Sequence, residues 1–152
     1  MKHLQDESVN KDDEKRTVLV GGCFDLLHYG HIRFLEEAKK LGDHLVVALE
    51  SDENVRKKKG ESRPIHTQEQ RKTMLESLSC VDEVIALPVM NTHQQYFDLV
   101  ERVHPQIIAI TQGDPVETNK REQATKIDAE LVVVSKVPTP STSQLAKLLG
   151  LE

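Results

Sequence analysis

The chain has 152 residues, of which 38% are hydrophobic and 30% are charged, so it can bury the core of one domain and is too hydrophobic for a disordered protein. Its formal net charge of -5 argues against a general nucleic-acid-binding protein, which needs a broad basic surface. Aromatic residues make up only 3% of the chain, too few for a surface on which bases stack.

The cysteines and the apolar segments predict a cytoplasmic protein. Cys23 and Cys80 are too few and too far apart for a disulfide framework or a zinc site, so a reducing compartment fits them. The longest apolar run, residues 45–49, is far shorter than the roughly 20 residues that cross a membrane. The polar N-terminus is also unlike a signal peptide. We therefore expect neither a membrane nor a nucleic acid as a partner.

The first 16 residues differ from the rest of the chain. Nine of them are charged, five acidic and four basic, and few are apolar. We expect residues 1–16 to form a flexible charged arm and residues 17–152 to form a single domain.

After this arm, short apolar segments alternate with longer segments of helical periodicity. A polar, lysine-rich stretch, residues 51–64, predicts a loop. Thr67 and Gln70 match a capping box, and one of residues 141–143 should cap the last helix. In chain order the pattern predicts strand 18–20, helix 30–42, strand 44–50, helix 67–77, strand 84–87, helix 96–103, strand 107–110, helix 115–128, strand 131–134 and helix 141–149.

Strict alternation of helices with strands rich in Val, Ile and Leu is typical of an α/β fold. We predict a Rossmann-like, doubly wound, five-stranded parallel sheet with helices on both faces. Such sheets bind ligands at the carboxyl ends of their strands, where the strand order reverses. The candidate site therefore lies in the segments that follow the strands, namely 21–31, 51–63, 88–91, 111–114 and 135–143.

Two histidines follow the first predicted strand. Gly21 and Gly22 let the backbone turn tightly and approach a ligand, and the loop leads into a helix whose free N–H groups favour phosphate. His28 and His31 are three residues apart at the start of this helix, so their side chains can face one point. An imidazole can hydrogen-bond a phosphate oxygen or stabilise growing negative charge. The segment therefore predicts a phosphate site, although it is neither a GxGxxG loop nor a Walker sequence.

Residues 22–31 resemble the signature of the cytidylyltransferase-like nucleotidyltransferases. The letters GCFD at 22–25 and HYGH at 28–31 match the loop and the HxGH motif of that family, placed after the first strand and at the start of the first helix. The stretch KGESRP at 59–64 is most similar to the adenylyltransferase domain of bacterial ADP-heptose synthases. The chain also resembles glycerol-3-phosphate cytidylyltransferase and archaeal FAD synthase. Further similarity covers residues 38–43, 51–52, 69–71, 81–85 and 141–143.

This resemblance implies an enzyme that transfers a nucleoside monophosphate from a nucleoside triphosphate, with ATP favoured, to a phosphorylated small molecule such as a sugar 1-phosphate, releasing pyrophosphate. It implies Mg²⁺ as the cofactor, bound through the nucleotide phosphates, with Asp25 as an additional candidate ligand. It is compatible with a homodimer. Glycerol 3-phosphate with CTP, FMN with ATP, and a nucleotide-binding sensor without transfer stay open as alternatives.

The resemblance also implies roles for individual residues. His28 and His31 would hold phosphates and stabilise the transition state. Lys59, with Lys58, would contact the acceptor phosphate or the α-phosphate, and Arg71 would brace the triphosphate. The implied catalytic residues are His28, His31, Lys59 and Arg71. The implied nucleotide-binding residues are Gly22, Cys23, Phe24, Asp25, Lys58, Gly113, Asp114, Ser141, Thr142 and Ser143.

Some of these residues also fit other roles, and parts of the chain depart from the family. Asp25 is also suited to a turn, and Arg71 to an ion pair on a helix surface. The pair Gly113-Asp114 comes one residue later than in relatives. Where cytidylyltransferases carry an arginine before the terminal cap, this chain has Lys136 or Val137. The nucleotide and the acceptor therefore stay open.

Overall fold

The computed structural model of the protein describes residues 15–152. The predicted arm lies outside these residues except for its last two. Arg16 is attached to the sheet, because its carbonyl accepts hydrogen bonds from the backbone N–H groups of Asp43 and His44. Its own N–H donates to the Asp43 carboxylate over 2.9 Å. Arg16, the last residue of the predicted arm, is thus hydrogen-bonded to the residues at the start of β2.

Five strands form one parallel sheet in the order β3-β2-β1-β4-β5. Their apolar residues fill both faces, as expected for strands covered by helices on each side. The central strand β1 pairs with β2 from Thr17↔His44 to Gly22↔Leu49, and with β4 on its other side. The predicted α/β fold is confirmed. The strands are β1 Thr17–Gly22, β2 His44–Leu49, β3 Glu83–Ala86, β4 Ile107–Thr111 and β5 Glu130–Val134.

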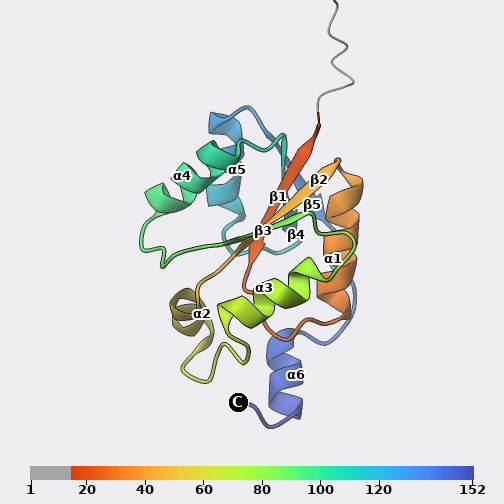
Figure 1. The fold of residues 1–152 in the computed structure, drawn as a ribbon, viewed down its shortest axis with the longest axis vertical. Helices are drawn as coiled ribbons and strands as arrows, with labels where there is room; N and C mark the ends of the chain where they lie inside the picture. Colours follow the sequence, from red (N-terminus) through yellow and green to blue (C-terminus); the bar gives the residue numbers. More distant parts are fainter. Residues whose placement is uncertain (1–14) are drawn as a thin grey trace, which may run out of the picture.

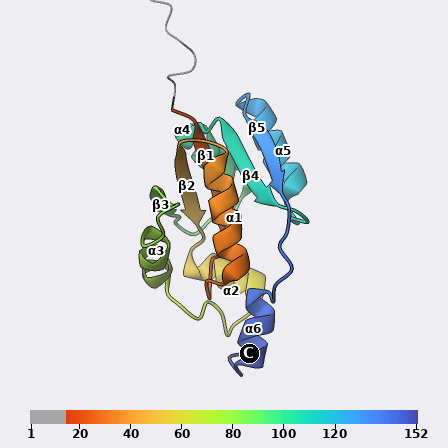
Figure 2. The ribbon, with the colours of Figure 1, turned by 90° about the vertical axis from the view of Figure 1, so that its right-hand side faces the viewer.

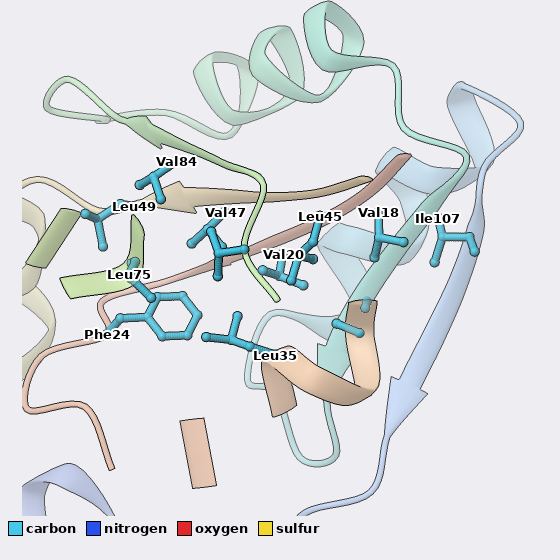
Figure 3. Close-up of a cluster of buried hydrophobic side chains, with 13 residues drawn as sticks. Val18, Val20, Phe24, Leu35, Leu45, Val47, Leu49, Leu75, Val84 and Ile107 are labelled. Atoms are coloured by element: carbon cyan, nitrogen blue, oxygen red, sulfur yellow. The ribbon is translucent and has the colours of Figure 1, made fainter. Parts of the chain in front are cut away.

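Four helices cover the two faces of the sheet (Figures 1 and 2). On one face, Leu35 and Ala38 of α1 and Leu75 of α3 pack with Val18, Val20 and other strand residues, a cluster that Figure 3 shows. On the other face, Leu99, Val100 and Ala124 pack against the remaining strand side chains. The helices are α1 Tyr29–Lys40, α3 Gln68–Glu76, α4 His93–Val103 and α5 Glu117–Lys126.

Two further helices, α2 Asp52–Lys59 and α6 Thr142–Leu148, lie beyond the carboxyl ends of the strands (Figure 2). The prediction of a loop over 51–64 is wrong for its first half. Ser51 caps α2 by accepting a hydrogen bond from the Asn54 N–H, and the Asn54 side chain bonds the backbone N–H and carbonyl of Met90. Val55 is buried, so the helix is anchored by its first half although its sequence is almost wholly polar.

The predicted caps of two helices are confirmed. Thr67 and Gln70 form a capping box at the start of α3, and Ser141 forms one with Gln144 at the start of α6. Among the described residues, no helix has the length and the apolar character needed to cross a membrane.

The order of the strands decides where a ligand can bind. The chain leaves β1 toward β2 and β3, then crosses back to β4 and β5 on the opposite side of β1. The connections after β1 and β4 therefore diverge, and they leave a crevice at the carboxyl ends of the strands.

Candidate active site

The loop that follows β1 holds an unusual backbone shape. Phe24 and Leu26 adopt left-handed conformations, with φ of 46° and 52°, which side-chain-bearing residues rarely adopt. The Phe24 ring is buried in the core with Leu35 and Leu75, and this burial offsets the backbone strain. Arg71 of α3 also stabilises this loop, because its Nη1 donates a hydrogen bond to the Cys23 carbonyl over 2.7 Å.

Asp25 anchors this loop to a distant segment. Its carboxylate is buried and accepts hydrogen bonds from Arg63 Nε at 2.7 Å and from the backbone N–H groups of Ile65 and His66 at 2.7 and 3.0 Å. Burial alone would raise the pKa of Asp25, but the two backbone hydrogen bonds and the Arg63 guanidinium hold it below its usual value. Both carboxylate oxygens are therefore occupied. Asp25 therefore orients the loop, and it is not among the residues that line the cleft, where we had expected it as a further Mg²⁺ ligand.

The two histidines form a stacked pair at the start of α1. His28 is the N-cap, and its Nδ1 accepts a hydrogen bond from the Gly30 N–H, while His31 Nδ1 accepts one from the His28 N–H. The ring centroids are 3.9 Å apart. Because each Nδ1 is an acceptor, each neutral ring carries its proton on Nε2. The pair thus offers two Nε2–H donors side by side.

Gly30 makes this stacking possible. A Cβ at position 30 would come within 2.9 Å of the His28 ring and within 2.9 Å of the Thr139 side chain. The glycine of the HxGH motif therefore leaves space for the first histidine and for the facing connection between β5 and α6.

Burial keeps His31 neutral. Desolvation, together with the nearby His28 and Lys59 side chains, lowers the pKa of His31 to about 3. Desolvation also lowers the pKa of His28. A neutral imidazole next to a lysine is suited to receive an anion, because the negative charge of a bound anion raises the pKa of the imidazole and favours its protonated form.

A cleft of about 430 Å³ opens over these histidines. Its floor is the end of β1 and the following loop, with Gly21, Gly22, Cys23 and Phe24. One wall is α1, with His28, Gly30, His31, Arg33, Phe34 and Glu37. The opposite wall is formed by Thr111, residues 135–137, Thr139 and residues 141–143, and Lys59 closes one side.

The cleft contains most of the residues that the sequence pointed to. His28, His31 and Lys59 line it, as do Gly22, Cys23 and Phe24. Ser141, Thr142 and Ser143 reach it from the start of α6. Burial raises the pKa of the Cys23 thiol despite the nearby Lys58, which fits a packing residue better than a nucleophile.

Arg71 lies elsewhere than predicted. The residue is fully buried at 0% exposure, and its guanidinium donates to the carbonyls of His66 and Cys23 and to the Asp52 carboxylate. Each of the three guanidinium nitrogens thus donates to a protein oxygen. Arg71 therefore fixes the loop and the start of α2, in place of the phosphate contact that the resemblance implied.

Three further predicted residues do not line the cleft. Lys58 Nζ is paired with the Glu50 carboxylate at 2.9 Å. Asp114 is engaged locally, because its oxygens accept from the Val116 N–H and from Lys120 Nζ. Gly113 belongs to the same turn, with φ of 82°. Thr111, two residues earlier, is the residue of this connection that reaches the cleft.

The segments predicted to hold the site include Gly30, Thr111, residues 135–137 and Thr139 of the lining, but not Arg33, Phe34 and Glu37. A signal for two of these exists, because Arg33 and Glu37 follow Gly30 at helical spacing, which marks one face of α1. Within the described chain, Lys59 and Lys136 form no ion pair, so they are the cleft cations free to meet an anionic ligand.

The family model of the cytidylyltransferase-like proteins matches residues 19–145. The chain therefore belongs to this family, a family of nucleotidyltransferases, as the motifs predicted. It is 37% identical over 133 residues to the bifunctional protein HldE of Aliarcobacter butzleri, which covers 88% of this chain and 26% of that protein. It is 36% identical over 141 residues to HldE of Campylobacter curvus, covering 93% and 29%. The chain thus spans less than a third of these curated relatives.

A solved structure agrees in fold over nearly its whole length. The lipopolysaccharide core biosynthesis protein from Thermoplasma volcanium superposes with a TM-score of 0.68 and 29% sequence identity. The match covers 82% of this chain and 99% of that one.

Proposed function

We propose that the protein transfers a nucleoside monophosphate, with ATP as the favoured donor, to a phosphorylated small molecule such as a heptose 1-phosphate-like sugar phosphate, with release of pyrophosphate. The observation that carries this proposal is the stacked His28–His31 pair, which lines a cleft next to Lys59, a lysine with no ion pair among residues 15–152. The resemblance of residues 59–64 to ADP-heptose synthases, and the likeness to a lipopolysaccharide core biosynthesis protein, support a sugar phosphate as acceptor.

The chemistry needs positioning and charge neutralisation more than a strong base. An oxygen of the acceptor phosphate, already an anion, forms a bond to the α-phosphorus, while the bond from that phosphorus to the bridging oxygen breaks and pyrophosphate leaves. Negative charge spreads over the α-phosphate and the leaving group. The Nε2–H donors of His28 and His31, together with the Lys59 ammonium, are suited to stabilise that charge. The hydroxyls of residues 141–143 are suited to hold the outer phosphates.

Mg²⁺ in this proposal arrives with the nucleotide. The described residues contain no group of three or more His, Cys, Asp or Glu side chains that could hold a metal ion. Mg²⁺ is commonly bound through substrate phosphates and water, and there it supplies charge neutralisation. The side chains named above act on the phosphates directly.

The experiment that tests the function is a matrix of donors and acceptors. ATP, CTP, GTP and UTP are each combined with heptose 1-phosphate, glycerol 3-phosphate, phosphocholine, phosphoethanolamine and FMN, with Mg²⁺ present, and pyrophosphate is measured. We expect the fastest release with ATP and the sugar 1-phosphate. Fastest release with CTP and glycerol 3-phosphate, or with ATP and FMN, would replace the proposed substrates. If the protein binds nucleotide but releases pyrophosphate with no pair of substrates, the proposed transfer is contradicted and the alternative of a nucleotide-binding sensor is supported.

The histidines predict that triphosphate binding takes up protons. Burial keeps His31 neutral, with a pKa of about 3, and a bound polyanion should raise that pKa. Binding should therefore take up protons at pH values between the pKa of His31 in the free protein and its pKa in the complex, and should strengthen as the pH falls through that range, by linkage. Calorimetry with ATP in two buffers of different ionisation enthalpy measures the uptake. The variant His31→Gln should take up fewer protons than the wild type, and equal uptake in both would contradict the role of His31.

The same pKa has a consequence for stability in the absence of ligand. The unfolded chain protonates His31 near pH 6.5, whereas the folded chain protonates it only near pH 3. Between these values the unfolded state binds more protons, so His31 lowers stability as the pH falls, by up to about 1.4 kcal/mol per pH unit.

A further inference from the structure

The last turn of α2 carries three consecutive lysines that point in different directions. Successive helical residues differ by about 100° around the axis. Lys57 Nζ lies 3.2 Å from Glu53 and 3.3 Å from the Asn91 side chain, and Lys58 Nζ lies 2.9 Å from Glu50. Lys59 makes no ion pair or hydrogen bond within residues 15–152, and it lines the cleft.

This turn has few attachments to the rest of the molecule. Residues 56–60 are all exposed, whereas Asn54 and Val55 are buried. The first half of α2 is thus anchored by packing. The last turn is attached to buried structure by Lys58, since Lys57 contacts Glu53 of α2 itself and the exposed Asn91. The partner of Lys58, Glu50, directly follows β2, and its backbone N–H donates to the Gly22 carbonyl in the cleft floor.

Glu50 is an unusual residue for this place. It is only 5% exposed, and besides Lys58 it accepts hydrogen bonds from the Tyr96 hydroxyl at 3.0 Å to each carboxylate oxygen. The Lys58 ammonium also lies 5.8 Å from the centre of the Tyr96 ring. The free energy lost when a carboxylate is removed from water is seldom exceeded by the attraction within a buried ion pair, so apolar residues at these positions would stabilise the fold equally well. What the ion pair does provide is a fixed orientation of the Lys58 side chain.

We infer that Glu50, held by Tyr96, is a positioning residue that binds Lys58 and thereby keeps Lys59 directed into the cleft. With Lys58 held at the sheet, the next residue along the helix is rotated toward the histidine pair. Lys59 is close enough to His31 to affect its protonation. This inference rests on the proposed function in assigning Lys59 to the phosphates.

The test is a double-mutant cycle between Glu50 and Lys59, in the full chain. Glu50→Gln should lower kcat by about tenfold or more, since misplacing a charged group by an ångström costs up to about a hundredfold. In the Lys59→Ala background the same change should alter kcat less than twofold, because Glu50 acts through Lys59. A loss of equal size in both backgrounds, or no loss in the wild-type background, would overturn the inference.

Two further measurements keep folding and function apart. Lys58→Met removes the same ion pair from the exposed side and should reproduce the effect of Glu50→Gln, with the matched control Lys57→Met within twofold of the wild type. Melting temperatures identify any variant that fails to fold. ATP affinity, measured by calorimetry through the same cycle, should fall in Glu50→Gln only when Lys59 is present. The ATP affinities test the role of Glu50 even if no acceptor yields pyrophosphate. Absence of pyrophosphate would contradict only the proposed transfer reaction.

Discussion

Replacing His31 with glutamine should lower the rate of pyrophosphate release by about two to three orders of magnitude, because it removes a donor aimed at the charge of the transition state. Glutamine is a common third residue in a capping box, so its side-chain oxygen can still accept the His28 N–H and the start of α1 should persist. The rate is measured by a coupled pyrophosphate assay under saturating substrates.

His28 allows an equivalent design. His28→Asn retains an N-cap acceptor for α1 and should lose a similar factor in rate with little change in melting temperature. His93→Gln, at the first position of α4 and remote from the cleft, is the matched control and should stay within twofold of the wild type. Near-normal rates for both His28→Asn and His31→Gln would show that the stacked pair does not stabilise the reacting phosphates.

The largest expected loss of stability comes from Asp25→Ala. Removing this carboxylate leaves Nε of Arg63, a residue only 2% exposed, without its acceptor and keeps Glu152 as the remaining partner of the guanidinium, and it orphans the N–H groups of Ile65 and His66. Breaking a buried ion pair from one side costs about 3–5 kcal/mol in the free energy of unfolding. Urea denaturation monitored by circular dichroism measures this loss.

The control for Asp25 is an exposed acid in a similar pair. Glu53→Ala removes the partner of Lys57 on the surface of α2 and should change the free energy of unfolding by less than about 0.5 kcal/mol. Asp25→Ala should also weaken ATP binding, because the loop that carries the cleft floor loses its anchor. A variant that unfolds like the wild type would refute the anchoring role.

The fold could be predicted because its strands consist of apolar residues that are stable only in the buried interior. Runs such as residues 45–49 and 107–110 are apolar throughout, which only burial on both faces explains. The helix α2 escaped prediction for the opposite reason. Its eight residues include one apolar residue, Val55, so no periodicity marks it. Its cap and the Asn54 contact to Met90 depend on the tertiary structure.

The site was predictable to the extent that it is local. His28, Gly30 and His31 are neighbours in sequence, and their geometry follows from one helix start. Arg71 could not be placed, because its three partners come from separate segments at 23, 52 and 66 that meet only in the folded chain. The choice among three adjacent lysines likewise depends on Glu50 and Asn91, which lie in other connections.

Because the strand order reverses at β1, the two halves of the chain supply opposite sides of the cleft. The amino-terminal half supplies the histidine pair and Lys59, whereas the carboxyl-terminal half supplies the wall at Thr111 and residues 135–143. No residue of 135–143 belongs to the core cluster around Phe24, Leu35 and Leu75, so we expect substitutions in that wall to leave this core intact. Under the proposed function, we therefore expect relatives that differ in nucleotide or acceptor to differ mainly in this wall and to share the histidine pair.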